Sequence, residues 1–256
     1  MYYVLIAHHN ECCFPKKQSN SKVIIVSEFD MTSIMDRVIS ILKSADAVCF
    51  DVDSTVIQEE GIDELAKFCG KGEEISNLTS KAMGGSMTFQ ESLSLRLNIL
   101  QPSKQQIQNF LDQQPAKLSP GIKDLVNLLQ KRKIAVYLVT GGFKCIVSPI
   151  ADQLNIPSEN IYSNRMKFYF DGEYAGFDET QPTSRTGGKA EVMRILKKSK
   201  GYKNVVMVGD GATDLEASPP ADAFIGYGGN VIRKAVQEKA KWFIKDFKQI
   251  IEILEK

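Results

Sequence analysis

Short apolar runs alternate with segments of helical periodicity along most of the chain. Runs with the length and continuity of buried strands lie at 47–50, 134–139, 205–208, 223–225 and 242–244. Apolar positions at helical spacing predict helices at 33–44, 120–129, 189–198 and 247–254, with Ser119 as the N-cap of the second. Alternating strands and helices predict an α/β fold, a three-layer, Rossmann-like core with a parallel sheet covered on both faces.

The segment 61–118 is more polar and reads as helical, without strand alternation. Thr88 and Glu91, and likewise Ser103 and Gln106, have the spacing of capping boxes. We therefore expect a small helical domain at 63–118, inserted into a core formed by residues 33–62 and 119–256. Residues 1–32 are expected to be a weakly ordered extension, and Met31 is a candidate alternative start.

The net charge and the positions of the histidines argue against several classes of function. The 256 residues include 32 Lys and Arg and 31 Asp and Glu, a net charge of +1, so no strong field attracts nucleic acid or an anionic membrane. The two histidines are His8 and His9. A catalytic histidine or a histidine-ligated zinc in the body of the chain is therefore excluded.

The cysteines indicate a reducing environment. Their number is 5, and no Cys-x-x-Cys pair occurs, which argues against a disulfide framework or a cysteine-rich zinc site. A cytoplasmic location fits best. The apolar start at 1–7 is short and lacks a basic region, so it is a poor secretory signal, while an organelle address within residues 1–30 stays open.

Three of the predicted strands end in turns suited to phosphate or metal chemistry. The turns are Asp-Val-Asp at 51–53, Thr-Gly-Gly at 140–142 and Gly-Asp-Gly-Ala-Thr-Asp at 209–214. Each alone is typical of a helix cap or a simple turn. Together they favour one site, because the C-terminal ends of parallel strands share an edge of the sheet and clustered carboxylates need a cation. Mg²⁺ suits a site of oxygen ligands, and Lys189 after a Gly-Gly turn could hold phosphate.

These motifs, in this order, resemble the four motifs of the haloacid dehalogenase superfamily. Further segments are similar to the phosphoserine phosphatase family within it, at 50–56, 59–63, 82–85, 177–182 and 226–230. The similarity runs from about residue 44 to the C-terminus. The resemblance implies a HAD-like core, with the helical insertion acting as a cap between the first and second motifs.

The resemblance also implies roles for the residues of the motifs. Asp51 would be the nucleophile that becomes an aspartyl-phosphate, and Asp53 the general acid and base. Mg²⁺ would be held by Asp51, by the backbone carbonyl of Asp53 and by the carboxylate of Asp210. Asp214 would not bind the ion directly but would orient the metal site or Lys189. Residues implied to bind phosphate are Thr140, Gly141, Gly142 and Lys189. Thr140 stands where many relatives have serine.

The implied substrate is O-phospho-L-serine, in the last step of serine biosynthesis. Arg96 would bind its carboxylate and Glu60 its ammonium group, although a surface arginine and a helix-terminal acid are the ordinary interpretations. Met83, Gly84 and Thr213 resemble further substrate contacts. Two alternatives remain, another small-molecule phosphomonoesterase or phosphotransferase, and a receiver-type phospho-Asp module. Neither a nucleic-acid nor a membrane partner is expected, and a homodimer is left open.

Overall fold

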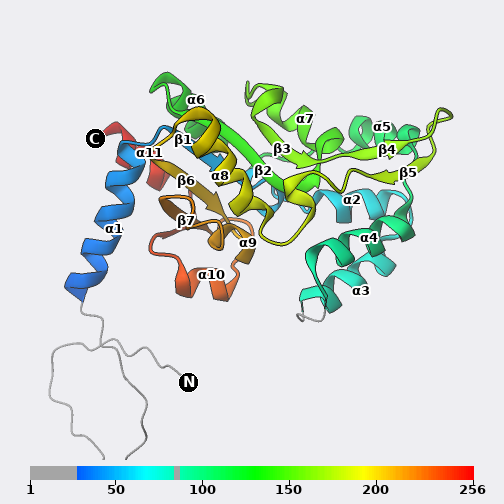
Figure 1. The fold of residues 1–256 in the computed structure, drawn as a ribbon, viewed down its shortest axis with the longest axis horizontal. Coiled ribbons are helices and arrows are strands. Elements are labelled where there is room, and N and C mark those ends of the chain that lie inside the picture. Colours follow the sequence, from blue (N-terminus) through cyan, green and yellow to red (C-terminus); the bar gives the residue numbers. More distant parts are fainter. Residues whose placement is uncertain (1–27, 84–86) are drawn as a thin grey trace, which may run out of the picture.

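The computed structural model describes residues 28–83 and 87–256 of the 256-residue chain (Figure 1). The predictions about residues 1–27, among them His8 and His9, lie outside the described part, as do Gly84 and the side chain of Met83. Among the described residues, no helix has the length and apolar character needed to span a bilayer.

A six-stranded parallel sheet forms the centre of the fold, as predicted. The spatial order is β3-β2-β1-β6-β7-β8. The strands are β1 Ala47–Phe50, β2 Ala135–Phe143, β3 Ile161–Asn164, β6 Val205–Gly209, β7 Ala223–Tyr227 and β8 Phe243–Ile244. Strands β1 and β6 lie side by side in the middle, so the residues that follow them are close neighbours at one edge.

Helices cover both faces of this sheet and make the three layers (Figure 1). Strand alternation divides the core: Val48 and Phe50 of β1 join one apolar cluster, whereas Cys49 joins another. The first face is covered by α1 Glu28–Lys43, α6 Ile122–Lys131, α7 Lys144–Gln153 and α11 Lys248–Glu255, and the second by α8 Gly188–Lys200, α9 Ala212–Leu215 and α10 Lys234–Lys239. Each buried leucine in these layers, such as Leu42, contributes roughly 1.5–3 kcal/mol, which keeps the strand ends rigid.

Four further helices stand beside the sheet layers, on the right in Figure 1. They are α2 Gly61–Phe68, α3 Gly72–Met83, α4 Phe89–Leu100 and α5 Lys104–Gln113. Leu65, Ile75 and Phe110 from three of them meet in an apolar cluster that also takes Ile146 of α7. Both predicted capping boxes are confirmed, since the side chains of Thr88 and Ser103 each accept a bond from the backbone three residues on. A two-stranded antiparallel hairpin is formed by β4 Met166–Phe168 and β5 Tyr174–Phe177.

Two chain segments connect these helices to the sheet layers. Ile57 and Leu118 form an antiparallel bridge, and Gln58 N donates to Lys117 O at 3.0 Å. The side-chain amide of Asn230 donates to Ile57 O at 3.2 Å and to the hydroxyl of Ser119 at 2.6 Å, so it holds both segments. Asn230, from the loop after β7, therefore adds a side-chain bond to each of two segments that already pair with each other.

Two local predictions are wrong. Ser119 is not a helix N-cap: α6 begins after Gly121, whose φ of 79° turns the chain, and the Ser119 hydroxyl is taken by Asn230. The Thr-Gly-Gly segment at 140–142 is not a turn but part of β2, which extends to Phe143 with an irregular register against β3. Helix α1 also begins at Glu28, earlier than the expected residue 33. Two short 3-10 turns, Ser158–Asn160 and Pro182–Ser184, complete the fold.

Candidate active site

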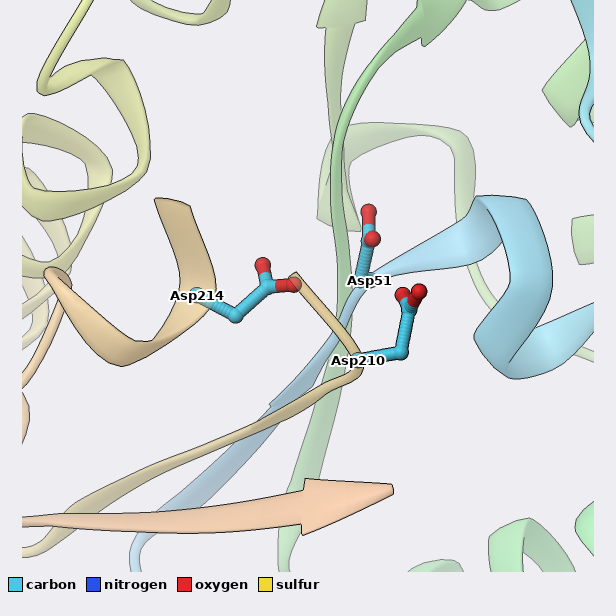
Figure 2. Close-up of side chains that lie close together, drawn as sticks. All are labelled: Asp51, Asp210 and Asp214. Carbon is cyan, nitrogen blue, oxygen red and sulfur yellow. The ribbon is translucent and has the colours of Figure 1, made fainter. Parts of the chain in front are cut away.

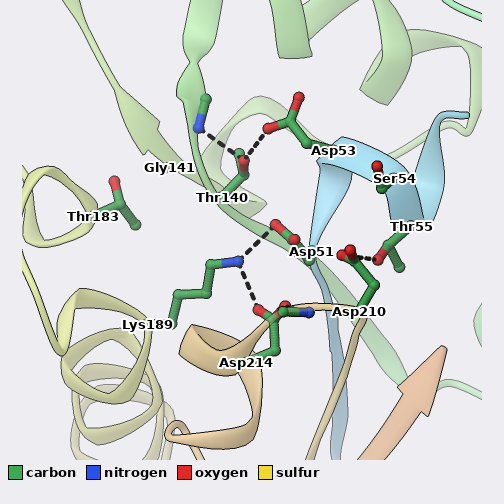
Figure 3. A network of polar contacts seen from close by, with 12 residues as sticks. Asp51, Asp53, Ser54, Thr55, Thr140, Gly141, Thr183, Lys189, Asp210 and Asp214 are labelled. Atoms are coloured by element: carbon green, nitrogen blue, oxygen red, sulfur yellow. Dashed lines mark hydrogen bonds and ion pairs between the residues drawn. The ribbon is translucent and has the colours of Figure 1, made fainter. Parts of the chain in front are cut away.

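The candidate residues meet where β1, β2 and β6 end (Figure 3). Asp51 follows β1, Asp210 follows β6, and Thr140 lies near the end of β2. Asp51 and Asp210 line a pocket of about 520 Å³, a size typical of small-molecule sites, together with Gly141, the neighbour of Thr140, and residues from α4. Parallel strands thus bring together groups that lie 159 positions apart in the sequence, from 51 to 210.

Three buried carboxylates lie close together at the ends of β1 and β6 (Figure 2). Oxygens of Asp51, Asp210 and Asp214 lie within 4.8 Å of one another. Burial, and then the charge of Asp214, raises the pKa of Asp51 well above its usual range. The three buried carboxylates repel one another, and nearby cations are needed to stabilise their charged forms.

Lys189 supplies one cation. Its ammonium lies 2.7 Å from Asp51 Oδ1 and 2.6 Å from Asp214 Oδ1. Burial acts to lower the pKa of Lys189, but the charges of Asp214 and Asp51 outweigh it and raise that pKa, so the ammonium stays charged. The start of α8 packs directly against the backbone at Pro182. A Cβ on residue 188 would collide with Pro182 O, so this approach requires a glycine. That glycine lets Lys189 reach the carboxylates.

Asp53 faces the pocket from a strained turn. Its Oδ1 accepts from Gly61 N at 2.7 Å and its Oδ2 from the Thr140 hydroxyl at 3.2 Å. Ser54, the next residue, has a left-handed φ of 54° inside the π-helical turn Val52–Val56, a conformation that often marks functional sites. Burial raises the pKa of Asp53, which favours its protonated form.

Backbone at the end of β2 forms the opposite wall. Gly142 N donates to the Thr140 hydroxyl at 2.8 Å, and Gly141 lies beneath the ring of Phe89 from α4. A Cβ on Gly141 would lie 2.6 Å from Phe89 Cζ, so a glycine is required for this approach. The Thr140 hydroxyl is thereby held between Gly142 and Asp53, and the N–H of Gly142 is already paired.

Comparison with known proteins identifies the family of this chain. A model of the haloacid dehalogenase-like hydrolases matches residues 45–222. The chain belongs to the haloacid dehalogenase-like hydrolase family. The phosphoserine phosphatase of Bos taurus is 59% identical over 212 residues, which cover 83% of this chain and 94% of the bovine protein. The chloroplastic phosphoserine phosphatase of Arabidopsis thaliana is 48% identical over 221 residues, 86% of this chain and 75% of that protein.

A solved structure agrees with this assignment. A phospho-aspartyl intermediate analogue of phosphoserine phosphatase matches with a TM-score of 0.70 at 26% identity, and the match covers 81% of this chain and 98% of that one. The chain is thus an enzyme of the hydrolase family, and the pocket at the strand ends is its candidate active site.

Predicted substrate contacts of this hydrolase line the same pocket from two directions. Arg96 enters from α4, half-buried, with its Nε donating to Ser92 O at 3.3 Å. Glu60 precedes α2, and Thr213 lies on α9. Burial raises the pKa of Glu60 to about 7, with the charge of Asp53 acting in the same direction.

Arg233, just before α10, was not predicted from the sequence. It lines the pocket and donates through Nε to Asp210 Oδ2 at 2.7 Å and through Nη2 to Glu60 Oε1 at 3.0 Å. Its one signal in the sequence is its position three residues after the family-like segment 226–230. Without the fold, an arginine in a polar loop is typical of a solvated surface.

The donor set fits a divalent cation that prefers oxygen. Lys189 and Gly211 N pair with the two oxygens of Asp214. Oxygens of Asp51 and Asp210 lie within 4.8 Å of each other, close enough for one cation to contact both carboxylates. The Thr55 hydroxyl donates to Asp210 Oδ1 at 3.1 Å and orients that side chain. Carboxylates without histidine or cysteine are the ligands of Mg²⁺ rather than of zinc or copper.

Proposed function

We propose that this hydrolase is a Mg²⁺-dependent phosphatase that converts O-phospho-L-serine to L-serine and phosphate, the last step of serine biosynthesis. The observation that carries this proposal is the pairing of Asp51 with Lys189 at 2.7 Å, beside Asp53, in the pocket. The high identity to proteins named phosphoserine phosphatase supports the choice of substrate.

Asp51 acts as the nucleophile. A carboxylate oxygen of Asp51 attacks phosphorus in line, and the bond from phosphorus to the serine oxygen breaks as the aspartyl-phosphate forms. Water then attacks the same phosphorus, releases inorganic phosphate and restores Asp51. The rigid end of β1 supports this role, because Asp51 N is bonded to Val208 O at 2.9 Å and cannot drift from the substrate.

Asp53 is the general acid and then the general base. It gives its proton to the serine oxygen as that bond breaks, and it takes a proton from the attacking water in the second half. Its raised pKa supports the first role, since the carboxyl must arrive protonated. The bonds from Gly61 N and Thr140 orient the group for both transfers.

Lys189, the Thr140 hydroxyl and the backbone of Gly141 and Gly142 bind the phosphoryl oxygens, so that charge developing in the transition state is balanced. For this, the Gly142 N–H and the Thr140 hydroxyl must exchange their present bonds, to Thr140 and Asp53, for bonds to the phosphoryl group. Asp51, Asp210 and the backbone carbonyl of Asp53 would hold Mg²⁺. When bound, the ion lowers the repulsion between an anionic carboxylate and an anionic phosphate. Asp214 keeps Lys189 in place.

The amino-acid end of the substrate is bound by charge. Arg96 binds the carboxylate and Glu60 the ammonium group, with Thr213, Met83 and Gly84 as further contacts. Residues 63–118, which hold α3–α5 and all of α2 but its first two residues, act as a cap that excludes water, while residues 33–62 and 119–256 act as the catalytic core. A cytoplasmic location and a homodimer remain predictions from the sequence.

Phosphate release measured with and without Mg²⁺ tests the proposal. O-phospho-L-serine is expected to be hydrolysed much faster than O-phosphothreonine or phosphoethanolamine, and only with Mg²⁺. Asp51→Asn should abolish turnover, whereas Asp152→Asn, an exposed carboxylate on α7, serves as the matched control. Equal rates on the three esters would favour a general phosphomonoesterase instead.

The receiver-type alternative is tested by Asp53. A receiver retains its phosphoryl group and has no alcohol to protonate, so Asp53→Asn would leave its slow dephosphorylation nearly unchanged. The proposed phosphatase should lose about 100-fold or more in kcat in this variant. An unchanged kcat would contradict the acid–base role of Asp53.

A further inference from the structure

Arg233 connects two carboxylates that have different tasks in the proposed function. Through Nε it holds Asp210, a proposed metal ligand, at 2.7 Å, and through Nη2 it holds Glu60, the proposed ammonium ligand, at 3.0 Å. The guanidinium is planar and rigid, so two bonds from different nitrogens fix the spacing of their acceptors. The group therefore sets where Glu60 stands relative to the centre of reaction.

Both fixed contacts of Glu60 fall on the same oxygen. Ser54 Oγ donates to Glu60 Oε1 at 2.9 Å, and Arg233 Nη2 donates to that same atom. Within residues 28–83 and 87–256, no hydrogen bond is made to Oε2. One oxygen of Glu60 is thus anchored, and the other is available to accept a bond from a ligand in the pocket.

The electrostatic surroundings make this anchor necessary. Burial raises the pKa of Glu60, and the charge of Asp53 raises it further, whereas the Ser54 bond and the charge of Arg233 act in the opposite direction. A neutral carboxyl would attract an ammonium group far less than a carboxylate does. Ser54 and Arg233, the two side chains bonded to Glu60 Oε1, therefore both favour its charged form.

We infer that Arg233 is a positioning residue that holds Glu60 for the ammonium group of the substrate, and that selectivity for amine-bearing phosphate esters depends on it. The inference rests on the proposed function. It differs from a role in phosphate binding, which would affect every phosphate ester equally. It also differs from a role confined to Asp210, which would affect catalysis on every substrate.

The test compares two esters that differ by one group. O-phospho-L-serine carries the amine, and 3-phosphooxypropanoate has the same carbon chain, carboxylate and phosphate without it. Arg233→Met should lower kcat/KM for O-phospho-L-serine about 30-fold, mainly through KM, and for 3-phosphooxypropanoate by less than about 3-fold. Arg194→Met, an exposed arginine on α8, is the matched control and should change neither value.

Two further variants separate this inference from a general loss of structure. Arg233→Lys keeps the charge but offers one nitrogen on a flexible chain, so it cannot hold Asp210 and Glu60 at the spacing that Nε and Nη2 set. This variant should show the same selective loss with a melting temperature near that of the wild type. In a Glu60→Gln background, Arg233→Met should remove no further selectivity. Equal losses on the two esters, or additive losses in the double variant, would overturn the inference. Whether the unmodified enzyme prefers O-phospho-L-serine is a separate result, and it reports on the proposed function alone.

Discussion

The ammonium of Lys189 lies 2.6 Å from a carboxylate oxygen of Asp214, and both side chains are buried. Removing one partner of such a buried pair is far more costly than removing both, because the remaining charge has no compensation. Lys189 also contacts Asp51, so its loss leaves Asp51 and Asp214 without their nearest cation.

Lys189→Met is therefore expected to lose activity and about 3–5 kcal/mol of unfolding free energy, measured by urea denaturation without divalent ions. Mg²⁺ should raise its melting temperature more than that of the wild type, because the ion now relieves a larger repulsion. The matched control is Lys197→Met on the same helix, whose partner Asp222 is more exposed. Identical Mg²⁺ shifts in all three proteins would show that the carboxylates are not balanced by Lys189.

Two substitutions at Thr140 test whether its hydroxyl takes part in catalysis. Thr140→Ser keeps the hydroxyl that binds Asp53 and Gly142 N, while Thr140→Val keeps the shape and removes the hydroxyl. The serine variant should stay within about 3-fold of wild-type kcat, and the valine variant should lose about 100-fold. Both are measured by phosphate release at saturating substrate. A valine variant as active as the serine variant would mean that the hydroxyl takes no part.

The contact between Gly141 and Phe89 joins helix α4 to the wall of the active site. A methyl group on Gly141 would collide with the ring at 2.6 Å, so Gly141→Ala must displace Phe89. We expect a cost of about 1–3 kcal/mol in stability, seen in urea denaturation, together with a higher KM. Phe89→Leu in the same chain should restore part of both losses by making room. The single Phe89→Leu variant is the control, and a double variant no better than Gly141→Ala would indicate that the glycine backbone itself is needed.

Much of the architecture follows from local pattern. Runs such as 47–50 and 205–208 are continuous and apolar because both faces of the sheet are covered, and the acidic residues after them mark the edge where strands end. Asp51 and Asp210 could be predicted for that reason. The capping boxes were equally readable, since each bond spans only three residues.

Long-range partners could not be read in the same way. Ser119 has the sequence of an N-cap, yet Asn230, more than a hundred positions away, binds its hydroxyl and the helix begins later. Arg233 belongs to the pocket only because the loop after β7 passes beside Glu60 and Asp210. Its partners lie on other segments, and no periodicity relates them. Capping and strand pattern are local properties, whereas these contacts depend on how the whole chain folds.

The turn at Asp178 predicts a pH-dependent contribution to stability. Its Oδ1 accepts from the Thr180 hydroxyl at 2.7 Å and from Thr180 N at 3.1 Å, and its Oδ2 accepts from Gln181 Nε2 at 2.7 Å. The side-chain bond from Thr180 is the largest cause that lowers the pKa of Asp178, to about 2. Because the folded pKa lies below the unfolded value of about 4, the contribution is present at neutral pH and is lost as the pH falls toward 2.

Asp178→Asn removes this contribution. The asparagine amide can still accept from Thr180 through its oxygen, but its NH₂ group faces Gln181 Nε2 with no lone pair to offer. The urea midpoint of the variant should lie below that of the wild type at pH 7, and the difference should shrink by about half at pH 3. Asp152→Asn should show no such trend. A difference that stays constant between pH 7 and pH 3 would mean that the ionised carboxylate contributes nothing, and that any loss comes from the shape of the turn alone.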